Sequence, residues 1–217
     1  MNSLATTAGI AAPILFLLTF TIEGLIRPGY SPASMPVSAL SIGPRGWIQI
    51  ANFLVSGCGI LFFALTAFRQ FRLAGKSRLA PILLIILAIA LFLSGPFVMD
   101  PPGTARAAWT LHGWIHQILG TVVFGLMPVI CLIFYLTLRS QRPARIFKVG
   151  TGAAIVLIIA AVIFMKLSQA GRPWFENNLG IFQRAALFSF MLWLAGLSSR
   201  LRRDSTRATL LLLQSVL

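Results

Sequence analysis

Acidic side chains are almost absent from this chain, which has four Asp and Glu residues in 217. Histidine is as scarce, with two residues, and charged residues of both signs make up only 10% of the chain. A soluble domain of ordinary composition has about 25% charged residues. Hydrophobic residues reach 58%, and the mean hydropathy is +0.89. The lack of charge therefore excludes an ordinary soluble globular protein.

Cysteine is also rare, and both residues, Cys58 and Cys131, fall inside long apolar runs. Two isolated cysteines provide neither a disulfide framework nor a Cys-based metal motif. Residues 1–12 contain no Lys or Arg, and Glu23-Gly24-Leu25-Ile26 is not a small-residue cleavage site. A secretory signal peptide needs both features, so we expect the first apolar run to be retained.

Six apolar runs dominate the sequence, and a helix needs about 20 apolar residues to cross a bilayer. Backbone groups in hydrocarbon must be bonded internally, so these runs predict helices. The expected fold class is all-α: a polytopic membrane protein with six transmembrane helices in three hairpins. We expect one six-helix domain, residues 1–207, and an apolar C-terminal tail, residues 208–217, too short to span. The predicted spans are residues 5–26, 46–68, 80–98, 112–138, 150–167 and 181–200.

The net charge of +14 comes from 18 Lys and Arg residues, whose distribution predicts the topology. Three basic clusters alternate with the other loops, which is the pattern of positively charged cytoplasmic loops. Both termini are then cytoplasmic (N-in/C-in), in the inner membrane of the cell. Topology and attraction to anionic lipid explain the charge, so we expect no nucleic acid partner. The clusters are Arg69, Arg72, Lys76 and Arg78; Arg139, Arg142, Arg145 and Lys148; and Arg200, Arg202, Arg203 and Arg207.

A faint internal repeat accompanies the three hairpins. Three short segments have equal spacing, since 113 − 46 and 180 − 113 both equal 67. If the hairpins are equivalent, Gln49, His116 and Gln183 lie at matching depths. A Gly-aromatic start at the membrane interface, where Trp is enriched, explains the same pattern without a repeat. The segments are Gly46-Trp47-Ile48-Gln49, Gly113-Trp114-Ile115-His116 and Gly180-Ile181-Phe182-Gln183.

The scarce ionisable residues gather on the predicted extracytoplasmic side. Three of the four acidic residues fall there, namely Glu23, Asp100 and Glu176. The two histidines, His112 and His116, are four residues apart and share one helix face. Because ionisable groups at membrane depth are costly, they mark functional sites. The sequence therefore predicts a polar pocket on this side of the membrane.

The histidine pair is a candidate metal site, because two imidazoles at i and i+4 can bind one divalent ion. With Asp100 as the nearest third ligand, the predicted site for zinc or another divalent metal is Asp100, His112 and His116. Glu23 or Glu176 offers a third ligand or a general base instead. The competing interpretation is that both histidines bond outer-loop carbonyls and Asp100. Haem fits less well, because one face of one helix cannot supply both axial ligands.

Ser38 is a candidate nucleophile, because Ser, His and Asp all fall on the outer side. Ser38 and Ser41 equally suit a turn or the cap of the next helix. Arg172 and Arg184 are candidates for binding a lipid phosphate or another anion. Each can instead pair with an acidic residue, because buried charges need partners.

The outer-loop motifs resemble a known family, the bacterial and archaeal six-helix membrane proteins called domain of unknown function 998. The resemblance covers about residues 28–116. It implies a six-helix membrane fold, and the family name defines no activity. The motifs are Pro28-Gly29-Tyr30-Ser31-Pro32, Pro36-Val37-Ser38-Ala39-Leu40-Ser41, Gly46-Trp47 with Asn52-Phe53, Gly95-Pro96-Phe97-Val98-Met99-Asp100-Pro101 and His112-Gly113-Trp114-Ile115-His116.

A looser resemblance involves membrane hydrolases of the ceramidase and adiponectin-receptor superfamily, which use Ser, Asp and an H-x-x-x-H pair around zinc. Ser38, Asp100, His112 and His116 match those residue types. Those proteins have seven helices and a third metal-binding His, whereas this chain has six predicted helices and two His in all.

The leading functional hypothesis is a metal-binding pocket at the extracytoplasmic side that acts on lipid, by hydrolysis. One alternative is a non-enzymatic accessory subunit or lipid-organising protein, with a membrane-protein partner or a second copy of the chain. A third is a small proton-coupled transporter. The lack of charge deep inside the second, third and sixth predicted helices argues against it, because a proton path crosses the membrane core. Arg184 lies only near the mouth of the sixth.

Overall fold

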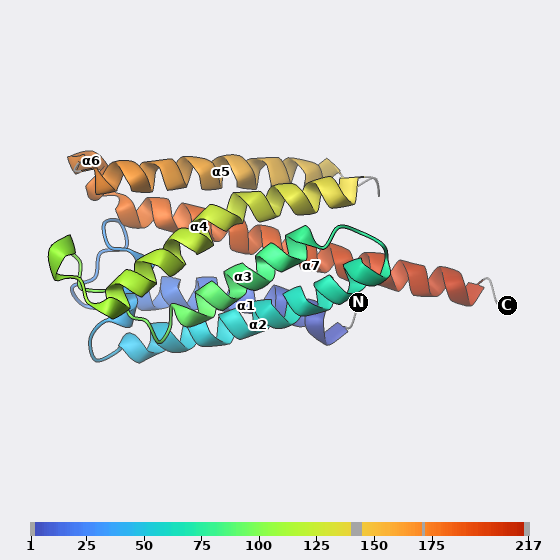
Figure 1. Cartoon of the computed structure of the whole chain (residues 1–217), viewed down its shortest axis with the longest axis horizontal. Coiled ribbons are helices and arrows are strands. Elements are labelled where there is room, and N and C mark those ends of the chain that lie inside the picture. Colours follow the sequence, from blue (N-terminus) through green and yellow to red (C-terminus); the bar gives the residue numbers. More distant parts are fainter. Residues whose placement is uncertain (1–2, 140–144, 171, 215–217) are drawn as a thin grey trace.

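The computed structural model describes residues 3–139, 145–170 and 172–214, apart from the side chains of residues 169 and 205–214. Within these ranges the chain is helical and contains no strand (Figure 1). The six long helices are α1 Ser3–Ile26, α2 Gly46–Leu73, α3 Leu79–Leu93, α4 Leu111–Leu138, α5 Arg145–Gln169 and α7 Leu179–Gln214. The three short ones are η1 Val37–Ser41, η2 Arg106–Ala108 and α6 Pro173–Glu176.

Five helices, all the long ones except α3, are long and apolar enough to cross a membrane. The all-α class is therefore confirmed, and the helices are those of a multi-pass membrane protein. α3 is shorter, at 15 residues. It ends at Leu93, whereas the span predicted from the sequence continues to residue 98. The difference arises at Pro96, which has no amide hydrogen to donate and so interrupts the helical hydrogen bonding.

The C-terminal segment continues the last long helix. α7 runs without a break to Gln214, so the predicted tail, residues 208–217, begins inside this helix. Residues 215–217 of that tail lie outside the described residues.

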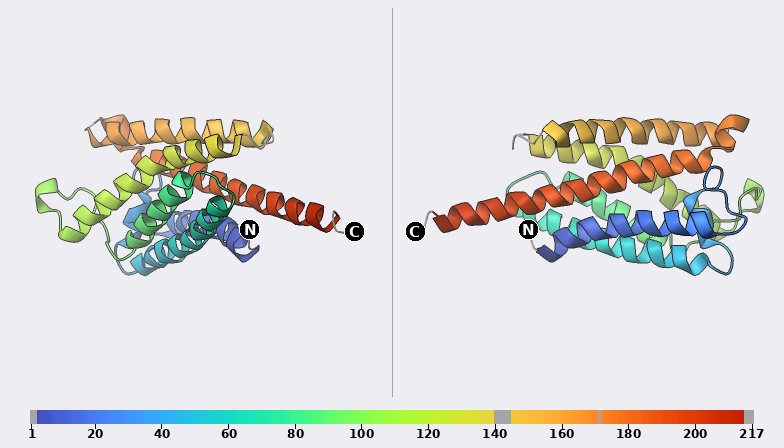
Figure 2. Two further views of the ribbon diagram at one scale, coloured as in Figure 1. Left: turned by 45° about the vertical axis from the view of Figure 1, so that its right-hand side comes forward. Right: turned by 180° about the vertical axis from the view of Figure 1, so that it is seen from behind.

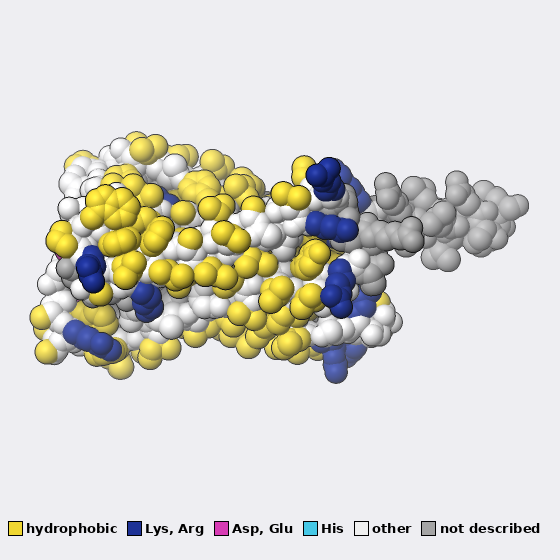
Figure 3. Space-filling view, turned by 90° about the horizontal axis from the view of Figure 1, so that it is seen from above, with side chains coloured by type: hydrophobic (Ala, Val, Ile, Leu, Met, Phe, Trp, Pro, Cys, Tyr) yellow, Lys and Arg dark blue, Asp and Glu magenta, His cyan; other side chains and the backbone are white. Residues whose placement is uncertain are grey.

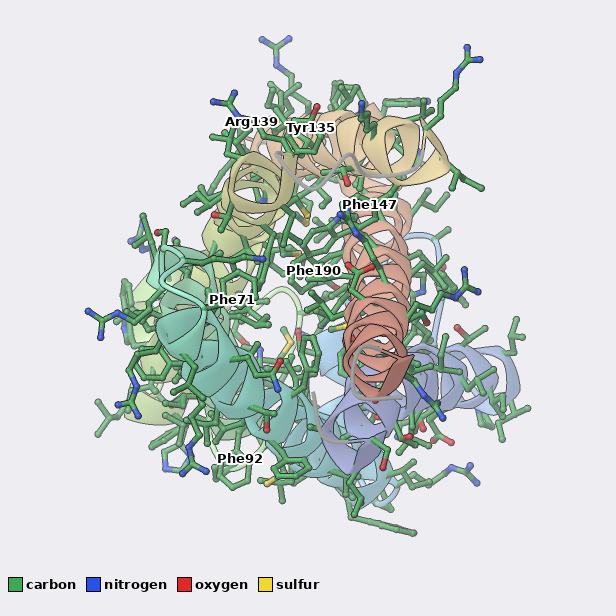
Figure 4. The ribbon with its side chains drawn as sticks, turned by 90° about the vertical axis from the view of Figure 1, so that its right-hand side faces the viewer. Phe71, Phe92, Tyr135, Arg139, Phe147 and Phe190 are labelled. Carbon is green, nitrogen blue, oxygen red and sulfur yellow. The ribbon has the colours of Figure 1, made fainter. Side chains whose placement is uncertain are left out.

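The six long helices form a ring in chain order. Each packs against the next along the sequence, and α7 closes the ring by packing against α1. Figure 4 looks along this ring from one end, and the buried Phe190 points toward its interior. Figures 1 and 2 show that α1 begins at the same end of the bundle at which α7 finishes. The loop with η1 lies at the opposite end, so successive helices run in opposite directions.

Two glycines of α2 let its ring neighbours approach closely. A Cβ on Gly57 would lie 2.8 Å from the backbone nitrogen of Phe92 in α3. A Cβ on Gly59 would lie 2.6 Å from the Cβ of Ala12 in α1. Small residues allow membrane helices to pack backbone to backbone. α1, α2 and α3 therefore form one closely packed wall of the ring.

An apolar belt surrounds the bundle between two ends that bear basic side chains. Figure 3 shows this belt on the face seen from above, with Lys and Arg gathered toward both ends. The three basic clusters predicted from the sequence lie at the end where α2 finishes and α5 begins. Arg142 and the side chain of Arg207 lie outside the described part. An apolar belt between charged ends is the surface of a protein that spans a bilayer.

Candidate functional site

A cavity of about 460 Å³ lies inside the ring at the η1 end, opposite the basic clusters. All six long helices and η1 contribute to its wall. Aromatic and aliphatic side chains cover most of it, among them Phe16, Phe53, Leu91, Val123 and Leu187. The polar lining includes Ser38, Asp100, His116, Gln117 and Gln183. Ligand pockets have this mixture of an apolar wall and a few polar groups.

The cavity has a polar end and an apolar end. Its lining residues on α4 run from Gly113 to Gly125, which is about 18 Å at a rise of about 1.5 Å per residue. On this helix the polar Gln117 comes before the apolar Phe124. Half of the bilayer hydrocarbon core is about 15 Å thick. The cavity is therefore about as deep as one leaflet.

His116 lies in the cavity wall and is 9% exposed. Its Nδ1 is 2.7 Å from the backbone carbonyl oxygen of Phe97. Because a carbonyl oxygen only accepts, Nδ1 donates this bond, so in the neutral form of the ring Nε2 is the acceptor. The Phe97 carbonyl lies beyond the end of α3 at Leu93, so it needs a partner from another element. The bond both satisfies that carbonyl and fixes the imidazole ring.

Asp100 caps the beginning of α4. Its Oδ2 accepts a hydrogen bond from the backbone nitrogen of Thr110 at 3.0 Å, and its Oδ1 accepts from Thr110 Oγ1 at 2.9 Å. Thr110 is itself the N-cap, and its hydroxyl accepts from the backbone nitrogen of Gly113 at 3.1 Å. A Cβ on Gly113 would collide with the Asp100 carboxylate, which is why glycine suits this position. A negative charge at a helix N-terminus is also favourable.

His112 does not join His116 in the cavity wall. It is exposed, and its ring packs against Phe97 with 5.4 Å between the ring centroids. Among the described residues, no three His, Cys, Asp or Glu side chains are close enough together to hold a metal ion. The metal site of Asp100, His112 and His116 stays a prediction, which metal analysis of the purified protein tests.

Ser38 reaches the cavity from η1 and is 9% exposed. Ser41 Oγ donates to the backbone oxygen of Ser38 at 2.6 Å, so Ser41 makes the turn that its residue type favours. The backbone nitrogen of Val37 donates to Gln183 Oε1, which ties η1 to α7. The Ser38 side chain is therefore held at the cavity by a loop with a fixed position.

Arg184 also ties the η1 loop to α7. Its Nη1 donates to the backbone oxygens of Pro32 at 2.7 Å and Met35 at 3.1 Å. Its Nη2 donates to the hydroxyl of Tyr30 at 2.6 Å, and the guanidinium lies over that ring at 5.5 Å. Burial of Tyr30 raises the pKa of its phenol, because burial disfavours the charged form. These bonds position the loop, and the predicted binding of an anion by Arg184 stays a prediction.

Glu23 is 3% exposed near the end of α1 and is bonded to two arginines. Arg45 donates to Oε1 at 2.9 Å and to Oε2 at 2.7 Å. Arg27 donates to Oε1 from Nε at 3.1 Å and from Nη2 at 3.0 Å. Arg27 also donates from Nη1 to the backbone oxygen of Ile42 at 3.1 Å. Glu23 thus joins α1 to both ends of the η1 loop, and its catalytic role stays a prediction.

Glu176 and Arg172 are exposed at α6, and neither lines the cavity. Of the site residues predicted from the sequence, the cavity brings together Ser38, Asp100 and His116.

Three lining residues, Gln117, Gln183 and Lys166, were not predicted as part of a site. The equal spacing of Gln183 from His116 was the one available signal, because it places both at similar positions on α7 and α4. Gln117 and Lys166 had no signal in the sequence beyond being polar.

The comparison with known families covers nearly the whole ring. The family described as Protein of unknown function (DUF998) matches residues 10–200. No curated protein and no solved structure matches the chain. The match reaches beyond residues 28–116, where the outer-loop motifs lie, to include the last two long helices. The chain therefore belongs to the DUF998 family.

Proposed function

We propose that this protein crosses the cytoplasmic membrane with six helices and binds a membrane lipid in its cavity. One acyl chain occupies the apolar end, and the polar part of the lipid lies beside Ser38, His116 and Gln183. The observation that carries this proposal is a cavity one leaflet deep with its polar groups at one end. Its volume of about 460 Å³ falls in the range of ligand pockets, about 300–1,000 Å³.

α3 is the sixth span in this proposal. It packs between α2 and α4, and residues 94–100 continue the chain beyond it as turns and irregular backbone. Backbone of this kind is tolerated at membrane depth where it is buried in protein or lines a cavity. The bond from His116 to Phe97 meets that condition. Six spans leave both termini on one side, and the basic clusters at that end favour the cytoplasm.

Native mass spectrometry of the protein purified in mild detergent tests lipid binding. Val162→Trp on α5 adds bulk to the cavity wall, and Val156→Trp on the exposed face of the same helix is the matched control. We expect bound lipid in the unaltered protein and in the control, and its loss in Val162→Trp. Equal lipid occupancy of all three proteins would show that the lipid binds elsewhere.

Hydrolysis of the bound lipid is a second candidate function, because Ser38 and His116 line the same cavity. No described residue bonds the Ser38 hydroxyl, and Nε2 of a neutral His116 ring is a base that would accept a proton. Ser38 Oγ would attack an ester carbonyl carbon, pass its proton to Nε2 and form an acyl-serine. The leaving alcohol would take that proton, and water would release the fatty acid.

Release of fatty acid from phospholipid vesicles by the reconstituted protein tests this second function. We expect Ser38→Ala to abolish release while it leaves bound lipid in place. Release that survives in Ser38→Ala would rule out this nucleophile, and no release from the unaltered protein would leave binding as the function.

A further inference from the structure

α4 and α5 open the ring at the cavity end. They lie side by side near the basic end and diverge toward the η1 end in two views (Figures 1 and 2). Residues on both helices line the cavity there and are also exposed: Thr121 and Gly125 on α4, and Lys166 on α5. Residues that combine these two properties mark a break in the wall of the ring.

Two glycines keep this break open on the α4 side. A Cβ on Gly120 or on Gly125 would meet no atom within 4 Å, and both glycines line the cavity. Gly57 and Gly59 differ in this respect, because a neighbouring helix occupies the space beside each of them. Gly120 and Gly125 instead border empty space, which a larger side chain would occupy.

The opening has the shape of a slot that runs from the membrane surface into the hydrocarbon. Its outer end is the exposed loop segment 101–103, and its inner end is Gly125. α4 and α5 bear exposed apolar side chains along this stretch, such as Ile118 and Ile163, so acyl chains of the bilayer border the slot. Lys166 lies near the outer end of α5, where a long cationic side chain extends toward the lipid headgroups.

The η1 loop, which contributes Val37 and Ser38 to the cavity wall, is held in place. Gln183 binds the backbone of Val37, and Arg184 binds the backbone of Pro32 and the hydroxyl of Tyr30. A ligand that enters from the side has no need to displace this loop.

On these grounds, we infer that an acyl chain of an outer-leaflet phospholipid enters the cavity sideways, through the slot between α4 and α5. This inference rests on the proposed lipid binding and adds its route and its source. The occupant is a membrane phospholipid because the slot joins the headgroup level to the depth of one leaflet. A ligand dissolved in water needs only the outer end of such an opening.

Photolabelling of the reconstituted protein tests the route. The probe is phosphatidylglycerol with a diazirine near the end of one acyl chain, in phosphatidylethanolamine vesicles. The peptides that contain Phe16, Phe53 and Leu187 report the cavity interior. Gly120→Phe and Gly125→Phe close the slot, and Gly152→Phe is the control, since a Cβ on Gly152 also meets nothing within 4 Å and Gly152 does not line the cavity. Thermal unfolding confirms that each variant folds.

We expect interior labelling in the unaltered protein and in Gly152→Phe, with a several-fold loss in Gly120→Phe and Gly125→Phe. Undiminished interior labelling in both slot variants would overturn the lateral route and leave lipid binding intact. No interior labelling in the unaltered protein would overturn lipid binding and the route together. A photocrosslinker at Thr121 that joins two copies of the chain would show that a second copy covers the slot, which also overturns the inference.

Discussion

The hydrogen bond from His116 Nδ1 to the Phe97 carbonyl oxygen, 2.7 Å long, joins the cavity wall to the end of α3. The same side chain lines the cavity. His116 therefore contributes both to the fold and to the cavity wall. His112 lies one turn away on α4 and is exposed, so the two histidines of the pair have different environments.

His116→Ala should lower the free energy of unfolding by about 1–3 kcal/mol, because the carbonyl of the half-buried Phe97 loses its partner. His112→Ala should change it by less than about 0.5 kcal/mol, as expected for an exposed side chain. Thermal unfolding in detergent, followed by circular dichroism, measures both. Equal losses in the two variants would contradict the asymmetry of the pair.

Gly113→Ala should destabilise the protein by about 1–2 kcal/mol, the size of a lost helix cap. The new methyl group would displace the Asp100 carboxylate from Thr110. Gly120→Ala is the matched control, since its Cβ meets no atom within 4 Å. The same unfolding measurement applies, and a variant Gly113→Ala as stable as Gly120→Ala would show that Asp100 does not hold α4 in this way.

The helices were predictable from the sequence because each is an uninterrupted apolar run. The end of α3 was missed for the same reason, since residues 80–98 are apolar on both sides of the break. Pro96 contained the missing information, because proline disfavours the helix at and before its position. The apolar run of α3 is thus visible in hydropathy, while the early end of this helix depends on one residue.

The end of the bundle at which the cavity lies was predictable from the sequence, whereas only some of its lining residues were. The spacing of His112 and His116 placed both on one helix face. One turn of α4 separates them, however, so that His112 is exposed at the end of the helix while His116 lies in the cavity wall. Asp100 was interpreted as a ligand because it precedes the histidines, whereas the local pattern of Thr110 before a helix favours capping. The bonds of Arg184 to a loop about 150 residues away left no local signal.

Arg184→Ala should loosen the outer loop, because Pro32, Met35 and Tyr30 each lose a bond. We expect faster hydrogen exchange in residues 30–41, measured by mass spectrometry, with little change in the long helices. Arg172→Ala removes an exposed arginine of the same outer side and should leave this exchange unchanged. Protection of residues 30–41 that persists in Arg184→Ala would mean that the other ties hold the loop without it.

Glu23→Gln should destabilise the protein by about 2 kcal/mol, because hydrogen bonds to a charged group contribute about 1.5–3 kcal/mol. The change leaves Arg27 without the carboxylate that compensates its charge, and the side chain of Arg27 is only 11% exposed. Arg45→Ala should cost less, since the Arg45 side chain is 49% exposed and Glu23 keeps its two hydrogen bonds from Arg27. Glu176→Gln, an exposed acid of the same side, is the neutral control. Thermal unfolding in detergent ranks the three variants, and a Glu23→Gln protein as stable as Glu176→Gln would show that this ion-pair cluster does not anchor the η1 loop.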